Sequence, residues 1–294
     1  MEECTKMVKA RVQFGRPISS FGLIKQKIGH AMVECYAAES LVNMVNGLMD
    51  SEYEDYAVEA AISKVFATEA LWRSVDEALQ LAGGNGYMKE FPFERAMRDS
   101  RINRIFEGTN DILRLFIALM AINDTGKNLQ EMAGSMKGIF DDPIKGFGLL
   151  SDYALRRASY ATGIGLQGKT TFTKLHPALK EQQLVFEDCT RELATFVDRL
   201  LRKHGKNIIE KQFPTRRLGD VMIDLFALAC VLSRVSSSIQ ENGLDAAKRE
   251  VEILRVFTGQ VRRRTRGNFS KIDNNDDDLI ESLADFAYEK EAYV

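Results

Sequence analysis

Helical periodicity is the feature of this sequence that most limits the folds it can adopt. Between residues 53 and 81 the apolar residues recur at steps of three and four, a spacing that gathers side chains on one face of an α-helix. The stripe consists of Val58, Ile62, Val65, Trp72, Val75, Leu79 and Ala82. Glu69 lies on the same face, so we expect it to be paired with a cation or to lie at the boundary of the core. The pattern therefore predicts one long amphipathic helix.

The same spacing predicts helices along most of the chain, and we find no convincing strand and no internal repeat. The further helices are expected at residues 18–49, 94–102, 111–122, 177–203, 207–241, 244–264 and 277–292. Frequent glycines between residues 128 and 170 are typical of a linker, which one amphipathic piece near residues 149–160 interrupts. We expect an all-α fold, with a helical bundle at residues 1–127, the linker at 128–170 and a second helical domain at 171–294.

Composition excludes few classes of protein. The chain has 294 residues and a net charge of −2, so nothing in the overall charge indicates a nucleic-acid partner. Its 4 cysteines and 3 histidines are scattered, and their spacing predicts neither a zinc site nor a disulfide framework. No apolar run is long enough to cross a bilayer, and the first residues do not resemble a targeting peptide. Either the protein stays where it is made, or its targeting segment lies outside this sequence.

Glu107 is the candidate catalytic residue, because it lies between an apolar pair and a glycine just before a predicted helix. A carboxylate beside Ile105 and Phe106 is expected to be partly desolvated, which raises its pKa and makes it a better base once ionised. Gly108 has no side chain to obstruct a substrate. Thr109 suits the N-cap of the following helix, as does the next residue, and a helix N-terminus attracts anions. The alternative is an ordinary surface glutamate in a helix-capping loop.

Three segments together resemble the acyl-CoA dehydrogenase family. They are residues 11–15 (Arg-Val-Gln-Phe-Gly), residues 80–86 and residues 98–110, and they follow one another in the family's order. The resemblance extends from residue 1 to about residue 122, and the helical region after residue 130 resembles the very-long-chain branch. It implies a flavin enzyme that removes two hydrogens from the α and β carbons of a fatty acyl thioester, leaving a trans-2-enoyl-CoA.

The resemblance also implies roles for individual residues. Glu107 would take the α-proton while the β-hydrogen passes as a hydride to FAD, and the backbone N–H of Glu107 would help to polarise the thioester carbonyl. Gly108 is the implied substrate contact. The implied FAD contacts are Arg11, Gln13, Phe14, Gln80, Gly83, Gly84, Thr109 and Asp111.

Two of these FAD segments have plainer interpretations when each is taken alone. Residues 11–15 can be a helix end followed by a turn, and residues 80–86 can be a helix stop followed by an Asn-Gly turn. Asp111 departs from many relatives, which have Glu or Gln there. By the resemblance Arg11 supplies charge to the FAD pyrophosphate, a role that suits a guanidinium because it can form two hydrogen bonds.

The implied partners are a fatty acyl-CoA substrate, electron-transferring flavoprotein as electron acceptor, and a second copy of the chain. In the family the FAD contacts at Arg11, Gln13 and Phe14 cross a subunit interface, so a homodimer is expected. The very-long-chain branch implies peripheral contact with the matrix face of the inner mitochondrial membrane, for which residues 149–157 are the candidate segment. A prokaryotic source would instead imply the bacterial cytoplasm.

Two other functions remain open at this point. Family members carry an N-terminal helical domain and a β-domain before the position of Met1, so this chain is expected to hold only the C-terminal half. A chain without those domains can serve as a non-catalytic helical interaction module, such as a respiratory complex I assembly factor. An acyl-CoA oxidase would use the same proton and hydride steps but pass electrons to oxygen. The motif around Glu107 favours the dehydrogenase, since a scaffold needs no base.

Overall fold

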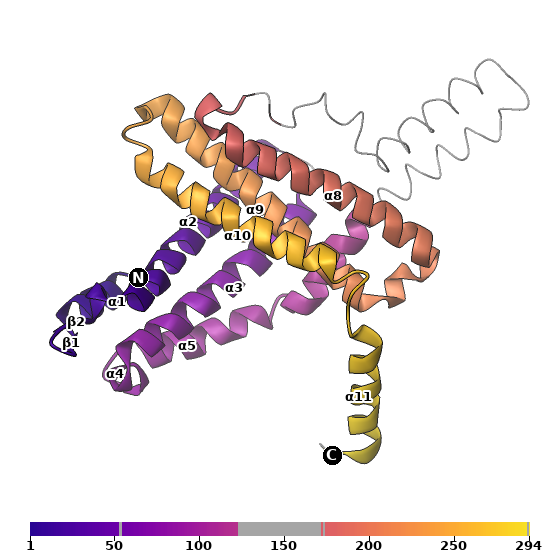
Figure 1. Ribbon diagram of the computed structural model, residues 1–294, viewed down its shortest axis with the longest axis horizontal. Coiled ribbons are helices and arrows are strands. Elements are labelled where there is room, and N and C mark those ends of the chain that lie inside the picture. The colour runs from indigo at the N-terminus through magenta and orange to yellow at the C-terminus, as the bar shows by residue number, and fades with distance from the viewer. Residues whose placement is uncertain (53–54, 123–171, 173, 293) are drawn as a thin grey trace, which may run out of the picture.

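The computed structural model describes residues 1–52, 55–122, 172, 174–292 and 294 (Figure 1). Helices make up most of these residues, which confirms the predicted all-α fold. The predicted linker at residues 128–170, with the candidate membrane segment at residues 149–157, lies outside the described residues. Among the helices that are described, none has the length and apolar character needed to cross a lipid bilayer.

The first half of the chain is built on two long antiparallel helices, α2 and α3, that lie side by side (Figure 1). The elements are α1 (Glu2–Ala10), η1 (Ile18–Ser20), α2 (Gly22–Asp50), α3 (Ala57–Ala82), α4 (Gly84–Tyr87), α5 (Phe93–Arg101), η2 (Ile102–Arg104) and a helix at residues 110–122. The four helices predicted here are present with ends shifted by a few residues. The sequence did not predict α1 and α4, because neither is long enough to show a periodic apolar stripe.

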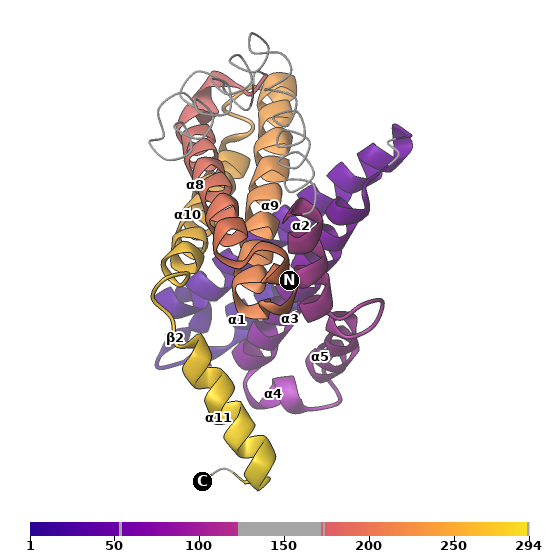
Figure 2. The same cartoon turned by 90° about the vertical axis from the view of Figure 1, so that its right-hand side faces the viewer.

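In the described part of the second half, from residue 174 onward, α8, α9 and α10 pack together and α11 projects away from them (Figures 1 and 2). Its elements are η4 (Pro177–Leu179), α8 (Lys180–His204), η5 (Gly205–Glu210), α9 (Gln212–Asn242), α10 (Lys248–Ser270) and α11 (Asp277–Lys290). α9 packs against α8 and α10 on one side and against α2 and α3 on the other. Because partners surround it, α9 is apolar over most of its circumference.

The two sets of helices share one hydrophobic core. Its largest cluster includes Leu41 of α2, Val65 and Phe66 of α3, Phe186 of α8, Leu228 of α9 and Phe257 of α10. The rings of Phe66 and Phe257 meet edge to face with centroids 6.0 Å apart, which joins α3 to α10 directly. An ion pair adds to the packing of α9 on α10, since the exposed Arg264 guanidinium donates to both oxygens of the buried Asp224 at 2.7 to 3.0 Å.

A short hairpin between α1 and α2 was not predicted. β1 (Val12–Gln13) pairs antiparallel with β2 (Arg16–Pro17). The two residues between the strands, Phe14 and Gly15, have φ of 53° and 77°, as a two-residue hairpin turn of type I′ requires. The sequence prediction of no strand was wrong because strands of two residues show no alternating pattern. Phenylalanine at a left-handed position is also not a usual turn signal.

Helix α11 projects from the packed helices (Figure 2), and its apolar residues are exposed. Leu279, Ile280, Leu283 and Phe286 are each between 43% and 61% exposed. Its first turn is fixed by Asp277, whose carboxylate accepts two hydrogen bonds from Arg217, one of them at 2.7 Å. The position of α11 therefore depends on its N-terminal end and not on burial of its apolar face.

The approach of α9 to the helix at residues 110–122 can be tested at Gly219. A Cβ at this glycine would lie 2.5 Å from the backbone oxygen of Arg114, so one of the two helices would have to move. We expect Gly219→Ala to lower the free energy of unfolding by about 1–3 kcal/mol in a urea titration, as overpacking does. Gly267→Ala is the matched control, since a Cβ there meets nothing within 4 Å. Equal stability of the two variants would show that the helices do not meet at Gly219.

Candidate active site

The loop of residues 105–109 turns the chain from η2 into the helix at residues 110–122. Glu107 and Gly108 have φ of 55° and 85°, so two successive residues adopt left-handed backbone conformations. Glycine does so readily, but for a residue with a Cβ the conformation costs about 1–2 kcal/mol. Contacts from outside the loop must therefore hold Glu107 in place.

Lys64 of α3 provides the first of these contacts. Its Nζ donates to the backbone oxygen of Gly108 at 2.9 Å and to Oδ1 of Asn110 at 2.8 Å. Burial lowers the pKa of Lys64, and nearby Glu69 and Glu107 only partly oppose this effect. One ammonium group thus binds the chain on both sides of Thr109.

Asn110 is the most buried polar residue of the segment, at 3% exposed. Besides accepting from Lys64, its amide donates to Oε1 of Glu69 and to Oγ1 of Thr68, each at 3.0 Å. The hydroxyl of Thr68 in turn donates to the backbone oxygen of Lys64 at 2.8 Å. Both ends of the amide are satisfied, as a buried polar group requires.

Glu69 is a structural anion, as its place on the apolar stripe indicated. Arg104 and Arg114 pair with Oε1 of Glu69 at 3.2 and 3.3 Å. Burial raises the pKa of Glu69, but the Asn110 hydrogen bond and the two guanidinium groups outweigh burial and hold the pKa below its ordinary value. Arg114 also donates to Oδ1 of Asp220 at 2.7 Å, so the network extends from α3 to α9.

Glu107 itself is exposed, so the predicted desolvation of its carboxylate is wrong for this chain. Ile105 and Phe106 are each 47% exposed. Sequence neighbours shield a carboxylate only when they fold back over it, and these two lie open on the same surface loop. The carboxylate is therefore accessible from solvent on a loop whose backbone is held from behind.

Thr109 caps the helix after this loop, as predicted. Its Oγ1 accepts from the backbone N–H of Ile112 at 3.3 Å, and its backbone oxygen accepts from that of Leu113 at 2.9 Å. Asn110, the other predicted cap, is the first helical residue, and its side chain belongs to the buried network instead. Asp111 is exposed in the first turn, where a carboxylate interacts favourably with the helix dipole.

The hairpin presents its predicted FAD residues to solvent. Arg11, Gln13 and Phe14 are all exposed, and Phe14 is 91% exposed although its backbone is left-handed. The ring of Phe14 meets that of Phe21 edge to face at 6.1 Å, and the Arg16 guanidinium lies 4.0 Å from the centroid of Phe21. A small cluster of aromatic and cationic groups therefore stands at the surface.

The third predicted segment lies where α3 ends. Gly83 has φ of 60° and its N–H donates to the backbone oxygen of Gln80 at 3.2 Å, which confirms the predicted helix stop. A Cβ added at Gly83 or Gly84 would meet nothing within 4 Å, so the backbone there faces open space. Gly86 differs, because its Cβ would lie 2.3 Å from the Leu79 oxygen. Only Gly86 is required by packing.

The structure brings some predicted site residues together and leaves others apart. Glu107, Gly108, Thr109 and Asp111 share one loop and helix start beside the N-terminal half of α3. The hairpin lies at the start of α2, and the segment with Gln80 and Gly83 lies at the far end of α3 (Figure 1). Of the supporting network, the sequence analysis predicted the pairing of Glu69 and singled out Asn110 only as a helix cap. Lys64, Thr68 and Arg114 have no motif of their own.

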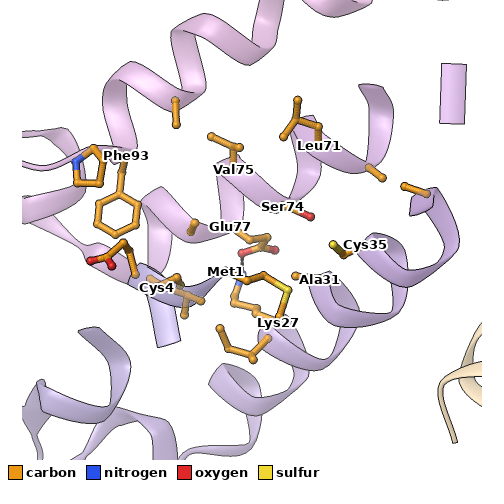
Figure 3. A pocket seen from close by; sticks show the side chains of 18 of the residues that line it. Met1, Cys4, Lys27, Ala31, Cys35, Leu71, Ser74, Val75, Glu77 and Phe93 are labelled. Carbon is orange, nitrogen blue, oxygen red and sulfur yellow. Dashed lines mark hydrogen bonds and ion pairs between the residues drawn. The ribbon is translucent and has the colours of Figure 1, made fainter. Parts of the chain in front are cut away.

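A cavity of about 390 Å³ lies between α1, α2, α3 and α5 (Figure 3). Its walls are largely apolar and include Cys4, Leu71, Val75 and Phe93, with the Lys27–Glu77 ion pair crossing from α2 to α3. None of the predicted site residues lines this cavity. The sequence analysis did not identify this cavity, because its lining comes from four helices and forms no motif.

The lowered pKa of Glu69 makes stability depend on pH. The folded protein binds this proton less tightly than the unfolded chain, so the contribution of Glu69 is present above its ordinary pKa and is lost as pH falls through the folded value. We expect Glu69→Gln to be about 2 kcal/mol less stable near neutral pH. The difference should close in acid, where the wild-type side chain is protonated.

Urea unfolding at several pH values measures this difference. Glu192→Gln, at an exposed position of α8, should track the wild type throughout. A Glu69→Gln deficit that is the same at acid and neutral pH would contradict the assignment of a lowered pKa.

Comparison with known proteins gives the relationship of the chain. Two family models match it: "Acyl-CoA dehydrogenase, C-terminal domain" over residues 1–121 and "ACAD9/ACADV, C-terminal domain" over residues 177–292. The very long-chain specific acyl-CoA dehydrogenase of Rattus norvegicus mitochondria is 40% identical over 265 residues, which are 90% of this chain and 40% of the rat protein. A probable acyl-CoA dehydrogenase of Bacillus subtilis is 29% identical over 85% of this chain and 41% of its own length.

A solved structure agrees with the sequence matches. Acyl-CoA dehydrogenase from Bacillus anthracis, in complex with FAD, superposes with a TM-score of 0.71 at 28% identity, covering 92% of this chain and 45% of that one. The chain thus spans less than half the length of these relatives. The resemblance drawn from three short segments is confirmed, and the chain belongs to the acyl-CoA dehydrogenase family, whose C-terminal helical domains it carries.

Proposed function

We propose that this chain serves the flavin-dependent α,β-dehydrogenation of a long or very-long-chain fatty acyl-CoA, with Glu107 as the base. The observation that supports this most is the conformation of Glu107. Its carboxylate is accessible, while its backbone is held left-handed by a buried network on α3. Backbone strain that surrounding contacts hold in place is concentrated at active sites and ligand-binding sites. Because the chain spans about 40% of its rat relative, the activity of the whole enzyme is part of the proposal.

The chemistry assigned to this chain is proton removal and carbonyl polarisation. The Glu107 carboxylate takes the α-proton, and the C–H electron pair forms the new double bond as the β-hydrogen leaves as a hydride. Among the described residues, no acceptor is bonded to the backbone N–H of Glu107. That N–H is therefore available to the thioester oxygen, where it stabilises the charge that develops as the α-proton is lost.

The residues present fit FAD at two separate places. Arg11 is exposed on the hairpin and can pair with a pyrophosphate through two hydrogen bonds, with Gln13 and Phe14 beside it. Gly83 and Gly84, with Gln80 before them, offer open backbone against which a flat group can lie. Thr109 and Asp111 lie at a helix start near Glu107. Bound FAD supplies the hydride acceptor that no amino-acid side chain provides.

The partners proposed with this activity follow the family. They are a fatty acyl-CoA substrate, electron-transferring flavoprotein as acceptor, and a second subunit that would receive the exposed hairpin. Location at the matrix face of the inner mitochondrial membrane, or in a bacterial cytoplasm, belongs to the same proposal.

One observation favours a second candidate function, a helical interaction module without catalysis. α11 projects from the body with an uncovered apolar face, and acidic residues surround that face. A helix of this kind is suited to a groove on another protein. If the chain acts by binding alone, removal of α11 should abolish its function and substitution of Glu107 should not affect it.

The visible absorption spectrum of the purified chain, with and without palmitoyl-CoA under anaerobic conditions, tests the proposed enzyme. We expect a flavin spectrum that bleaches with substrate. Glu107→Gln should keep the flavin and slow its bleaching by about 100- to 10,000-fold, because a general base contributes roughly this factor and the amide cannot accept the proton.

Glu90→Gln, at an exposed loop position, is the matched control and should bleach at the wild-type rate. Full bleaching by Glu107→Gln would rule out the assigned base. A protein that binds no flavin, even when FAD is added, would favour the interaction module.

A further inference from the structure

The loop that carries Glu107 is bound to the rest of the molecule mainly through backbone and side-chain groups on either side of Thr109. Gly108 contributes its backbone oxygen and Asn110 its amide oxygen, and both accept from the same ammonium group of Lys64. Resting on the proposed function, we propose that Lys64 is a positioning residue. It holds the loop in its left-handed conformation and so directs the Glu107 carboxylate toward the substrate.

Lys64 is well placed to do this because its own backbone is rigid. It lies on α3 beside Val65, which is 1% exposed, and two residues after Ile62, which is 3% exposed. A donor fixed to a core helix transmits the rigidity of the core to the loop. A donor on another surface loop would not do so.

The two acceptors explain why an ammonium group suits this position. The Gly108 backbone oxygen and Asn110 Oδ1 both accept from the same Nζ. An ammonium group has three donor hydrogens and can rotate so that each oxygen receives one of them. The charge strengthens each bond relative to a neutral donor. Glu107 also acts on this charge, since its carboxylate is one of the groups that oppose the burial-induced lowering of the Lys64 pKa. Lys64 therefore interacts with three groups of this segment: the Gly108 backbone oxygen, the Asn110 amide oxygen and the Glu107 carboxylate.

The amides whose protection depends on this arrangement can be identified. Phe106 N–H donates to the Ile102 oxygen, and the N–H groups of Ile112 and Leu113 donate to Oγ1 and O of Thr109. These bonds require the loop to keep its path on both sides of Glu107. If Lys64 holds that path, its loss should expose these amides without affecting the distant helices.

Lys64→Met tests the proposal because it keeps the aliphatic stem and removes the ammonium group. We expect hydrogen–deuterium exchange at Phe106, Ile112 and Leu113 to accelerate about 10- to 100-fold, the range expected for loss of hydrogen bonds to a charged group. Lys64→Arg should restore most of the protection. Lys27→Met, which breaks a lysine ion pair elsewhere between α2 and α3, should leave these three amides unchanged.

Steady-state kinetics of the same variant test whether the position of the Glu107 carboxylate affects catalysis. In the flavin-loaded protein, Lys64→Met should lower kcat by about 10- to 100-fold and change KM less than about 3-fold, because the base is misplaced while most substrate contacts remain. Wild-type exchange at the three amides, or a wild-type kcat, in folded Lys64→Met would overturn the proposal. If that variant does not fold, Lys64→Gln is measured in the same way with the same criteria.

The two proposals can fail separately. An acyl-CoA with sulfur in place of its β carbon can lose an α-proton but cannot pass on a hydride. Absence of α-hydrogen exchange into deuterated water by the wild-type protein would count against Glu107 as base. The amide-exchange measurement would still decide whether Lys64 holds the loop.

Discussion

The carboxylate of Glu69 is the group on which the rest of the candidate site depends. It lies on α3 and meets Asn110, Arg104 and Arg114, which all belong to the segment around Glu107. A half-buried carboxylate is stable only when several donors compensate for its lost hydration. The pairing of Glu69 therefore attaches this segment to α3 through Arg104, Asn110 and Arg114. Because Glu107 lies between the first two of these residues, its loop has little conformational freedom.

α9 extends this support into the second half of the chain. Arg114 bonds to Asp220 of α9, and the absence of a side chain at Gly219 lets the α9 backbone approach the Arg114 oxygen. Hydrophobic burial is non-directional and brings the helices together without setting their rotation. The Arg114–Asp220 ion pair and the contact at Gly219 set the rotation of α9 against the helix at residues 110–122. The C-terminal helices are thus part of the structure that positions the loop of Glu107.

The sequence predicted those features of the structure that depend on neighbouring residues and on repeated apolar spacing. Helix positions follow from apolar spacing, and the pairing of Glu69 follows from its place on an apolar stripe. The exposure of Glu107 could not be predicted in this way, because burial is decided by segments far away in the chain. The contact of Lys64 with Asn110 joins residues 46 positions apart, and no spacing rule reaches that far. The hairpin at Phe14 was missed because its strands are too short to show a pattern.

Backbone strain connects two of the predicted segments. Of the four non-glycine residues with positive φ in the described chain, Glu107 and Phe14 are predicted site residues, while Glu52 and Glu291 lie at helix ends. At Glu107 hydrogen bonds from α3 offset the strain. At Phe14 the ring meets that of Phe21 edge to face and remains 91% exposed. Within the described residues the hairpin is held by its own strand pairing and by the hydrogen bond from the Ile18 N–H to the Arg11 oxygen. The proposed role of the hairpin at a subunit interface would bring a second surface against this exposed ring.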